Sequence, residues 1–192
     1  MANLTILLPA LDEVGALPEL VAEIPLEKLE RDGLNTRIVL MDGGSKDGTP
    51  DVARELGLDV LSQREGRGKG VALRQSFSYF LDSGDDVLVM LDSDGSYDTA
   101  DMPRLLHHLV ENDLDVVIGS RLRGRIEKGA MSRFNYVGNH ILTWAAVALY
   151  RRFMSDVCTG YWAFTRAAIS RMDLNSSGFE IEAEMYAACV HN

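Results

Sequence analysis

The sequence predicts an α/β fold with a mostly parallel central sheet flanked by helices. Short apolar runs alternate with segments of helical periodicity, which is typical of βαβ units. Polar segments follow several of the apolar runs, at the points where the chain would leave a parallel sheet. The chain has 192 residues, 46% of them hydrophobic, and no repeat or low-complexity linker divides it. We therefore expect one continuous domain over residues 1–192.

Apolar runs indicate the strands of the first part, which are Leu4–Leu8, Arg37–Met41, Leu58–Leu61, Val87–Leu91 and Asp115–Ile118. Helical periodicity indicates the segments between them, which are Val14–Glu30, Thr49–Leu56, Gly70–Leu81 and Asp101–Glu111. Pro50 and Pro103 stand where the first turn of a helix accepts a proline.

The pattern changes after residue 119. A polar, basic stretch extends to Arg133, and an apolar helix is predicted from there to about Arg152. Thr159–Thr165 is predicted as a further strand and Glu182–Asn192 as a final helix. We accordingly distinguish two parts of the domain, residues 1–118 and residues 119–192.

The charge is unevenly distributed along the chain. The formal net charge of −10 argues against a nucleic-acid partner, yet residues 1–115 carry −13 and residues 116–192 carry +3. The second part is therefore expected to face something anionic. No basic segment precedes Leu4–Leu8, so we expect no targeting signal. The longest apolar run, Ile141–Tyr150, is about half of the roughly 20 residues that span a bilayer.

Four of the predicted strands end in polar segments, namely Pro9–Glu13, Asp42–Thr49, Asp92–Asp98 and Gly119–Arg121. Ligands of open α/β sheets bind outside the carboxyl ends of the strands. We therefore expect these four segments to lie beside one another and to form one site.

Asp92 and Asp94 stand at i and i+2 directly after an apolar strand. Two carboxylates this close repel each other unless a cation lies between them, and Mg²⁺ or Mn²⁺ prefers such oxygen ligands. An acidic turn that caps the next helix explains the pair equally well. An EF-hand is excluded, because counting from Asp92 the sixth position is Tyr97 and the twelfth is Pro103.

Two glycine-rich loops also precede helices. Asp42–Thr49 has the composition of a tight turn, which by itself is the simpler interpretation. In the second loop, Arg67 and Lys69 together with free amides at the helix start could hold an anion. A solvated charged loop fits that segment about as well, and Gly70 after Lys69 excludes a Walker loop.

Taken in order, these segments resemble the family 2 glycosyltransferases of GT-A fold, and within them the dolichol-phosphate mannose synthases. The likeness covers nearly the whole chain. It rests on Pro9–Glu13 (P-A-x-x-E), Asp42–Thr49 (D-[DG]-G-S-x-D-G-T), Asp92–Asp94 (D-x-D), Gly119–Arg121 (G-S-R) and Asp156–Arg166 (D-x-x-[ST]-G-[FY]-x-x-[FL]). It implies a Rossmann-like GT-A fold, a nucleotide-sugar donor bound to residues 1–118 and an acceptor bound to residues 119–192.

The resemblance also implies roles for individual residues. The donor site would comprise Pro9, Ala10, Glu13, Asp42, Lys69 and Asp92. The metal, Mg²⁺ or Mn²⁺, would be held by Asp92, Asp94 and Ser96, with Ser96 standing where the family often has glutamine. The residues expected at the reacting centre are Asp94, Asp156 and Arg121, although Asp156 could also be a turn residue ahead of a strand.

The expected acceptor is a polyprenyl or dolichyl phosphate, bound by Ser120, Arg121 and Arg133. Basic residues crowd the stretch before the apolar helix, which suits an anionic lipid head and an isoprenoid tail. A core helix beside a solvated basic loop is the alternative. We expect an inverting transfer by a cytoplasmic protein in peripheral contact with the cytoplasmic face of a membrane.

Other functions remain open at this point. The acceptor could be soluble and phosphorylated, and the donor could carry mannose, glucose or N-acetylglucosamine on GDP or UDP. Asp92-x-Asp94-x-Ser96 also resembles the first motif of haloacid-dehalogenase-type phosphatases, although here it follows the fourth predicted strand. Chains of the resembled family usually continue further, so we expect truncation at Asn192 and consider a non-catalytic nucleotide-sugar-binding fragment as well. The pattern indicates no oligomeric state.

Overall fold

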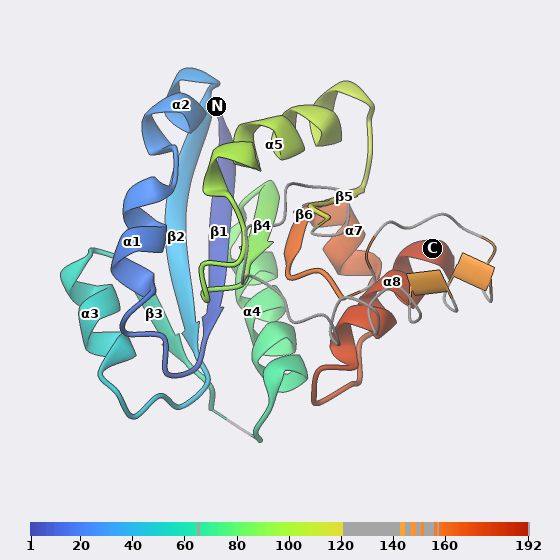
Figure 1. The fold of residues 1–192 in the computed structure, drawn as a ribbon. Coiled ribbons are helices and arrows are strands. Elements are labelled where there is room, and N and C mark those ends of the chain that lie inside the picture. The colour runs from blue at the N-terminus through green and yellow to red at the C-terminus, as the bar shows by residue number, and fades with distance from the viewer. Residues whose placement is uncertain are drawn as a thin grey trace.

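A single sheet forms the centre of the molecule (Figure 1). In this computed structural model, residues 1–64, 66–120, 143–144, 147–148, 151, 156 and 158–191 are described. Within them, six strands pair in the order β3-β2-β1-β4-β6-β5. Their bounds are β1 Ala2–Ala10, β2 Leu34–Asp42, β3 Asp59–Ser62, β4 Val87–Leu91, β5 Val116–Ile118 and β6 Tyr161–Thr165. The predicted strands are therefore present, and the first two are longer than their apolar runs.

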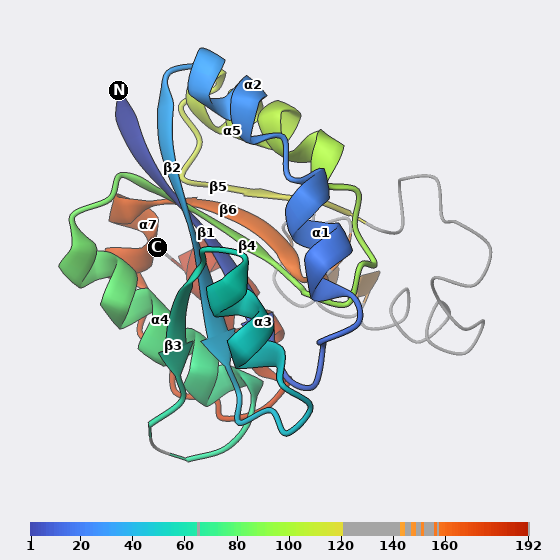
Figure 2. The same cartoon turned by 90° about the vertical axis from the view of Figure 1, so that its left-hand side faces the viewer.

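β6 is the antiparallel member of the sheet. β1 pairs in parallel with both β2 and β4, whereas β6 runs antiparallel to β4 on one side and β5 on the other. The start of β6 consequently lies between the ends of β4 and β5 (Figure 2). The expectation that four polar strand ends would be direct neighbours is thus correct for β1, β2 and β4 only.

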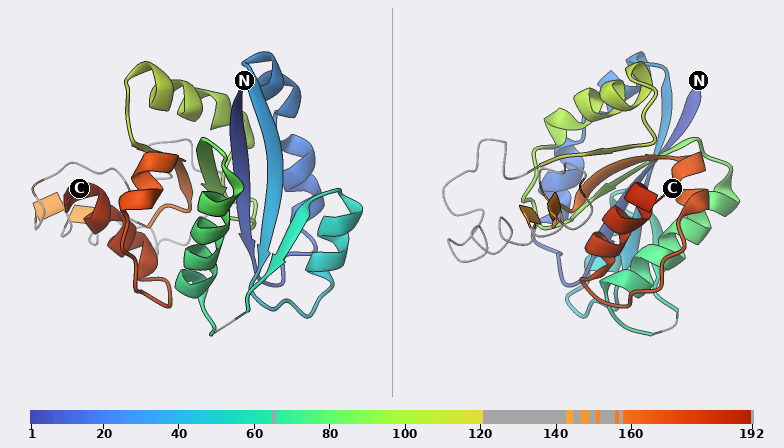
Figure 3. Two further views of the ribbon diagram at one scale, coloured as in Figure 1. Left: turned by 180° about the vertical axis from the view of Figure 1, so that it is seen from behind. Right: turned by 90° about the vertical axis from the view of Figure 1, so that its right-hand side faces the viewer.

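Helices cover both faces of the sheet (Figure 3). One layer consists of α1 (Leu17–Glu23), α2 (Leu26–Arg31), α3 (Thr49–Glu55) and α5 (Met102–Glu111), preceded by the 3₁₀ turn η1 (Thr99–Asp101). The other consists of α4 (Lys69–Ser83), α7 (Arg166–Arg171) and α8 (Ile181–His191). Among the described helices, none combines the length and the apolar character that crossing a bilayer demands.

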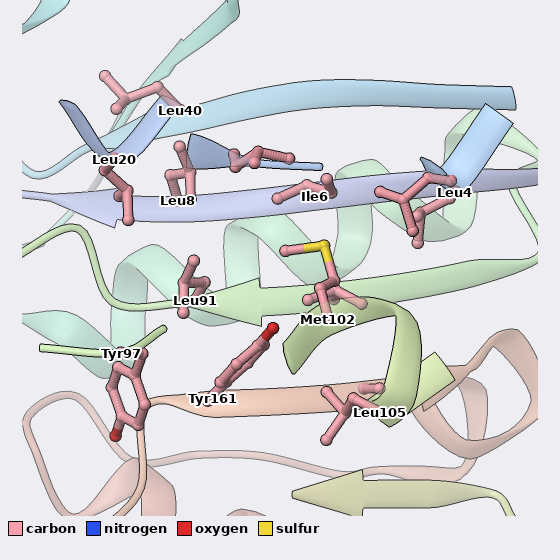
Figure 4. Close-up of a cluster of buried hydrophobic side chains, with 14 of the residues drawn as sticks. Leu4, Ile6, Leu8, Leu20, Leu40, Leu91, Tyr97, Met102, Leu105 and Tyr161 are labelled. Carbon is pink, nitrogen blue, oxygen red and sulfur yellow. The ribbon is translucent and has the colours of Figure 1, made fainter. Parts of the chain in front are cut away.

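Alternation along the strands assigns each core residue to one layer. Leu4, Ile6 and Leu8 of β1 pack beneath α1 and α5, while Leu7 packs with the α4 side. Figure 4 shows the first of these clusters, in which Leu91 and Met102 also lie. Because both faces are covered, the strands are apolar on both sides, which explains why continuous apolar runs identify them in the sequence.

Two helical expectations are corrected. The predicted helix Val14–Glu30 is divided into α1 and α2, because Ile24 is extended, with ψ of 124°, ahead of Pro25. A residue before proline is disfavoured in the helical region, so the break follows from the sequence. The helix α7 was not predicted, although Thr165 caps it by accepting a hydrogen bond from the Ala168 amide at 3.1 Å. The predicted helix from Arg133 to Arg152 lies largely outside the described residues.

Candidate functional site

The loops that follow β1 and β2 are bound to each other. The Thr49 hydroxyl accepts a hydrogen bond from the Glu13 amide at 2.9 Å and donates one to Asp47 at 2.6 Å. Asp47 also accepts the Val14 amide at 3.0 Å, and Asp12 accepts the Lys46 amide at 2.7 Å. The conformation of each loop therefore depends on the other, which fixes Glu13 at the edge of the sheet.

The ends of β1, β2 and β4 are joined in a similar way. Ala10 pairs with Asp42 in the strand register, and the Ala10 carbonyl accepts the Gly43 amide at 2.9 Å. On the other side of β1, the buried Ser93 hydroxyl donates to the Pro9 carbonyl at 2.8 Å. Pro9 and Ala10 consequently lie between Asp42 on one side and the segment that carries Asp92 and Asp94 on the other.

Lys69 connects this edge to the last helix. Its ammonium lies 2.8 Å from Asp92 Oδ1 and 2.6 Å from Glu182 Oε1. The three side chains are only 14%, 20% and 10% exposed, respectively. Burial alone lowers the pKa of Lys69, but Asp92 and Glu182 outweigh it and raise that pKa above its ordinary value. Lys69 is therefore a permanent cation held between two carboxylates.

Gly160 packs directly against Asp92. The Asp92 amide donates to the Gly160 carbonyl at 3.0 Å, and a Cβ built on Gly160 would stand 1.8 Å from Asp92 Oδ2. Only glycine leaves room for the carboxylate at this point. The start of β6 thus forms one wall of the site, and Lys69 forms another.

A network of hydroxyl groups holds the start of β6 in place. The Tyr97 hydroxyl accepts the Gly160 amide and lies 3.2 Å from the Thr159 hydroxyl, which in turn donates to the Gly119 carbonyl. Tyr97 also packs edge-on against Tyr161, with 5.5 Å between ring centroids (Figure 4). The ends of β4, β5 and β6 are thereby connected through buried groups.

The segment before α8 covers the start of α4. The Ser177 carbonyl accepts the amides of Gly70 at 3.0 Å and Val71 at 3.3 Å. A Cβ on Gly68 or Gly70 would lie 2.3 Å from a carbonyl oxygen of this segment, so both positions require glycine. Free amides that hold an anion were one of the two interpretations of this loop, and the structure contradicts it for Gly70 and Val71, because Ser177 occupies both amides. Any anion here would meet the Lys69 side chain instead.

The site is electrostatically acidic around Glu13. Burial is the largest cause that raises the pKa of Glu13, and Asp94, Asp47 and Asp92 add to it in that order. These carboxylates are thus close enough to repel one another across the ends of β1, β2 and β4. A divalent cation or a neutralising ligand would relieve that repulsion.

Asp94 and Ser96 present oxygen atoms that suit a metal. Asp94 is exposed, and its Oδ1 accepts the Ser96 amide at 2.9 Å. The Ser96 hydroxyl oxygen is buried and has no hydrogen-bond partner among the described residues. Within that same part of the chain, no three His, Cys, Asp or Glu side chains converge as a metal-binding group. A cation at this edge would therefore need ligands beyond the protein carboxylates, such as phosphate oxygens.

The structure thus places at one edge of the sheet the residues predicted for the donor and for the metal, namely Pro9, Ala10, Glu13, Asp42, Lys69, Asp92, Asp94 and Ser96. Asp156 is fully buried and stands shortly before Gly160. Ser120 is half-buried just after β5. Arg121 and Arg133 lie outside the described residues.

Glu182 was missed as a site residue. The alternating acidic residues of Phe179–Met185 fit a solvated helix face, and Glu180 and Glu184 are indeed exposed and half-buried. Glu182 is instead buried and forms an ion pair with Lys69. Because Ile181 and Met185 face the core, Glu182 lies at the border of that apolar face. The position of Glu182 between the core residues Ile181 and Met185 was the signal in the sequence that it could be buried. The sequence does not identify its partner Lys69, which is 113 residues away.

Comparisons with known proteins agree on one family. A family model described as Glycosyl transferase family 2 matches residues 5–172. The chain is 35% identical over 184 residues to glycosyltransferase AglJ of Haloferax volcanii, which covers 96% of this chain and 57% of AglJ. It is 31% identical over 198 residues to the undecaprenyl-phosphate mannosyltransferase of Micrococcus luteus, covering 96% of this chain and 76% of that enzyme.

Solved structures show the same fold. The glucosyl-3-phosphoglycerate synthase of Mycobacterium tuberculosis, crystallised with Mn²⁺, UDP-glucose and phosphoglyceric acid, matches with a TM-score of 0.73 at 21% identity. The match covers 96% of this chain and 64% of the synthase. The expected α/β fold of GT-A type is confirmed. The chain spans little more than half the length of AglJ and under two thirds of the synthase.

Proposed function

Because the chain belongs to glycosyltransferase family 2, we propose that it transfers a hexose from a nucleotide sugar to a phosphate-bearing acceptor. The observation that carries this proposal is the convergence of the ends of β1, β2 and β4 with Lys69 in one polar site. Ligands of open α/β sheets bind at such an edge. The phosphatase alternative is discarded, because that family places its motif after a first strand, whereas here the motif follows β4 and the chain belongs to glycosyltransferase family 2.

The donor would lie across this edge of the sheet. Pro9 and Ala10 offer backbone at the end of β1, and Glu13 and Asp42 offer carboxylates for a nucleoside. The Lys69 ammonium is the cation nearest to Asp92 among the described groups and would face the diphosphate. Solved structures of the same fold hold UDP-glucose, which supports this assignment.

The donor set at Asp92, Asp94 and Ser96 fits Mg²⁺ or Mn²⁺. The unpartnered Ser96 hydroxyl beside the exposed Asp94 carboxylate supplies the oxygen ligands that such ions prefer. When bound, the ion would neutralise charge that develops on the leaving diphosphate. Asp92, already paired with Lys69, would contribute less than Asp94.

The proposed acceptor is a polyprenyl phosphate, with the protein in contact with the cytoplasmic face of a membrane. Mannosyltransferases that act on undecaprenyl and dolichol phosphate are among the relatives. An acceptor phosphate oxygen would attack the anomeric carbon as its bond to the diphosphate breaks, with inversion. A phosphate monoester is mostly dianionic at neutral pH, so it needs positioning more than a base. Ser120, Arg121 and Arg133 are proposed for that positioning, and Asp156 for a place near the reacting centre.

A soluble phosphorylated acid is the second candidate acceptor. It is favoured by the synthase of the same fold that was crystallised with phosphoglyceric acid. Both acceptors present a phosphate, so the same residues would serve either.

Turnover measurements can decide among these possibilities. Radiolabelled GDP-mannose and UDP-glucose would be incubated with Mn²⁺ and either polyprenyl phosphate in detergent or 3-phosphoglycerate, on the wild-type chain and on Asp94→Asn. Asp59→Asn is the matched control, because Asp59 is exposed at the opposite end of edge strand β3. We expect transfer from one donor, lost in Asp94→Asn and retained in the control. Donor binding without transfer to either acceptor would favour a non-catalytic nucleotide-sugar-binding role.

A further inference from the structure

We propose that Glu182 is a positioning residue that sets the charge of the donor site through Lys69. This inference rests on the proposed function, because it concerns how the site divides its affinity between a divalent cation and a diphosphate. Three contacts carry it. Lys69 forms an ion pair with Asp92 and another with Glu182, and the segment before α8 is hydrogen-bonded to the start of α4.

Backbone contacts between two helix starts hold Glu182 close to Lys69. Lys69 is the first residue of α4 and Glu182 lies in the first turn of α8, and their charged groups are 2.6 Å apart. The Ser177 carbonyl bonds the Gly70 and Val71 amides, so the two helix starts cannot move independently without losing those hydrogen bonds. Glu182 is therefore held against Lys69 by backbone contacts as well as by charge.

The contact around Lys69 contains one more carboxylate than ammonium groups. Asp92, Lys69 and Glu182 together carry one net negative charge within a largely buried contact. A site of that sign attracts a cation and resists a free anion. Charge effects between groups that are partly removed from water are stronger than at an exposed surface. Glu182 balances part of the positive charge of the Lys69 ammonium, so more of the negative charge of Asp92 is left for a metal ion.

Loss of the Glu182 carboxylate would change which group compensates the Lys69 ammonium. Without Glu182, the ammonium would be compensated by Asp92 alone, and a divalent cation would have to compete with Lys69 for that carboxylate. The same change would make the site less negative and so improve its affinity for a free diphosphate. Glu182 thus tunes two affinities in opposite directions, although it need not touch either ligand.

The Glu182→Gln variant tests this directly, because it keeps the size of the side chain and removes its charge. Binding of Mn²⁺ alone would be followed by the electron paramagnetic resonance of the free ion. Binding of GDP and UDP would be followed by calorimetry in EDTA. We expect Mn²⁺ to bind about tenfold more weakly and the preferred diphosphate at least threefold more tightly, as order-of-magnitude effects of one charge.

Two further substitutions make the result decisive. Lys69→Met changes the charge the other way, so it should tighten Mn²⁺ binding and weaken diphosphate binding. Glu182→Gln added to Lys69→Met should change both affinities less than it does on the wild type, because the group through which Glu182 acts is then absent, and this comparison also serves if Glu182→Gln alone does not fold. Glu184→Gln removes a carboxylate from the same helix that instead accepts the Asn175 and Ser176 amides at 2.9 and 2.8 Å. It loosens the segment on α4 and should change both affinities less than about twofold.

The outcomes separate the two proposals. Opposite changes of the two affinities in Glu182→Gln support the inference, since damage to the fold would weaken both. If wild type binds its ligands but Glu182→Gln changes neither affinity, or changes both in the same direction, the inference is overturned and the proposed function stands. A folded wild-type chain that binds neither Mn²⁺ nor any diphosphate removes both proposals.

Discussion

The contact between Gly160 and Asp92 predicts a specific effect of one added methyl group. In Gly160→Ala, the new Cβ would lie 1.8 Å from Asp92 Oδ2 and 2.1 Å from its Cγ. Ordinary contact begins near 3.4 Å, so the carboxylate must retreat by about 1.6 Å. That displacement exceeds what the 2.8 Å ion pair with Lys69 can absorb. Asp92 would therefore leave its position at the end of β4.

The magnitude follows from two separate costs. Overpacking of this kind costs about 2 kcal/mol, which for a chain of this size lowers Tm by roughly 4–8 °C. A displacement of about 1 Å at a reacting site costs on the order of 100-fold in rate. We therefore expect a folded protein with a moderately lower Tm and a loss of donor binding of at least about tenfold.

Thermal unfolding and calorimetric titration of the donor nucleotide measure these two effects. Gly15→Ala is the matched control, because a Cβ at Gly15 meets nothing within 4 Å and its backbone is not left-handed. It should leave both quantities near their wild-type values. A Gly160→Ala protein whose Tm lies within about 1 °C of wild type and whose donor affinity is unchanged would refute the reasoning.

Two side chains, Thr49 and Glu184, hold loops of the site in place and should contribute to the stability of the fold. Thr49→Val leaves the part-buried Glu13 amide without the acceptor that the fully buried Thr49 provides, so urea unfolding should show a loss of about 1–3 kcal/mol. Thr49→Ser should lose less, and a valine variant as stable as the wild type would contradict this reasoning. Burial alone raises the pKa of Glu184, but hydrogen bonds from the Ser176 and Asn175 amides outweigh it and hold that pKa below 4.5. A lowered folded-state pKa stabilises the protein above the unfolded pKa, and this contribution disappears as the pH falls through the folded value. Urea unfolding of wild type and Glu184→Gln from pH 7 down to about pH 3.5 measures this contribution. The difference in stability between the two proteins should be constant above about pH 5.5 and shrink below it. A difference that grows on acidification would contradict the assignment.

Much of the donor half could be predicted from the sequence, because its signals are local. Val87–Leu91 was located without error, since a short apolar run between polar segments has few other interpretations. The break at Pro25 was available in the same way, through the restriction that proline places on Ile24. The positions of Asp42 and Asp92 at strand ends followed from those runs together with the general rule for parallel sheets.

The remaining features depend on pairings that the sequence does not encode locally. Periodicity identified β6 as a strand but not its antiparallel direction or its place beside β4. The same limit applies to Lys69, whose two carboxylate partners are 23 and 113 residues away. Glu182 and Glu184 look alike in sequence, and only packing of α8 distinguishes the carboxylate on Lys69 from the one that caps a loop.

The insertion of β6 has a consequence for synthesis on the ribosome. When residues 1–120 have emerged, β4 is an open edge, because the strand that covers it, β6, is still to be translated. Open edges pair readily with other chains and favour aggregation. The wall that Gly160 provides for Asp92 is missing throughout that interval. Completion of the acidic site and covering of β4 by β6 therefore occur in one late event, and a nascent chain cannot acquire its ligand geometry before it has protected this edge.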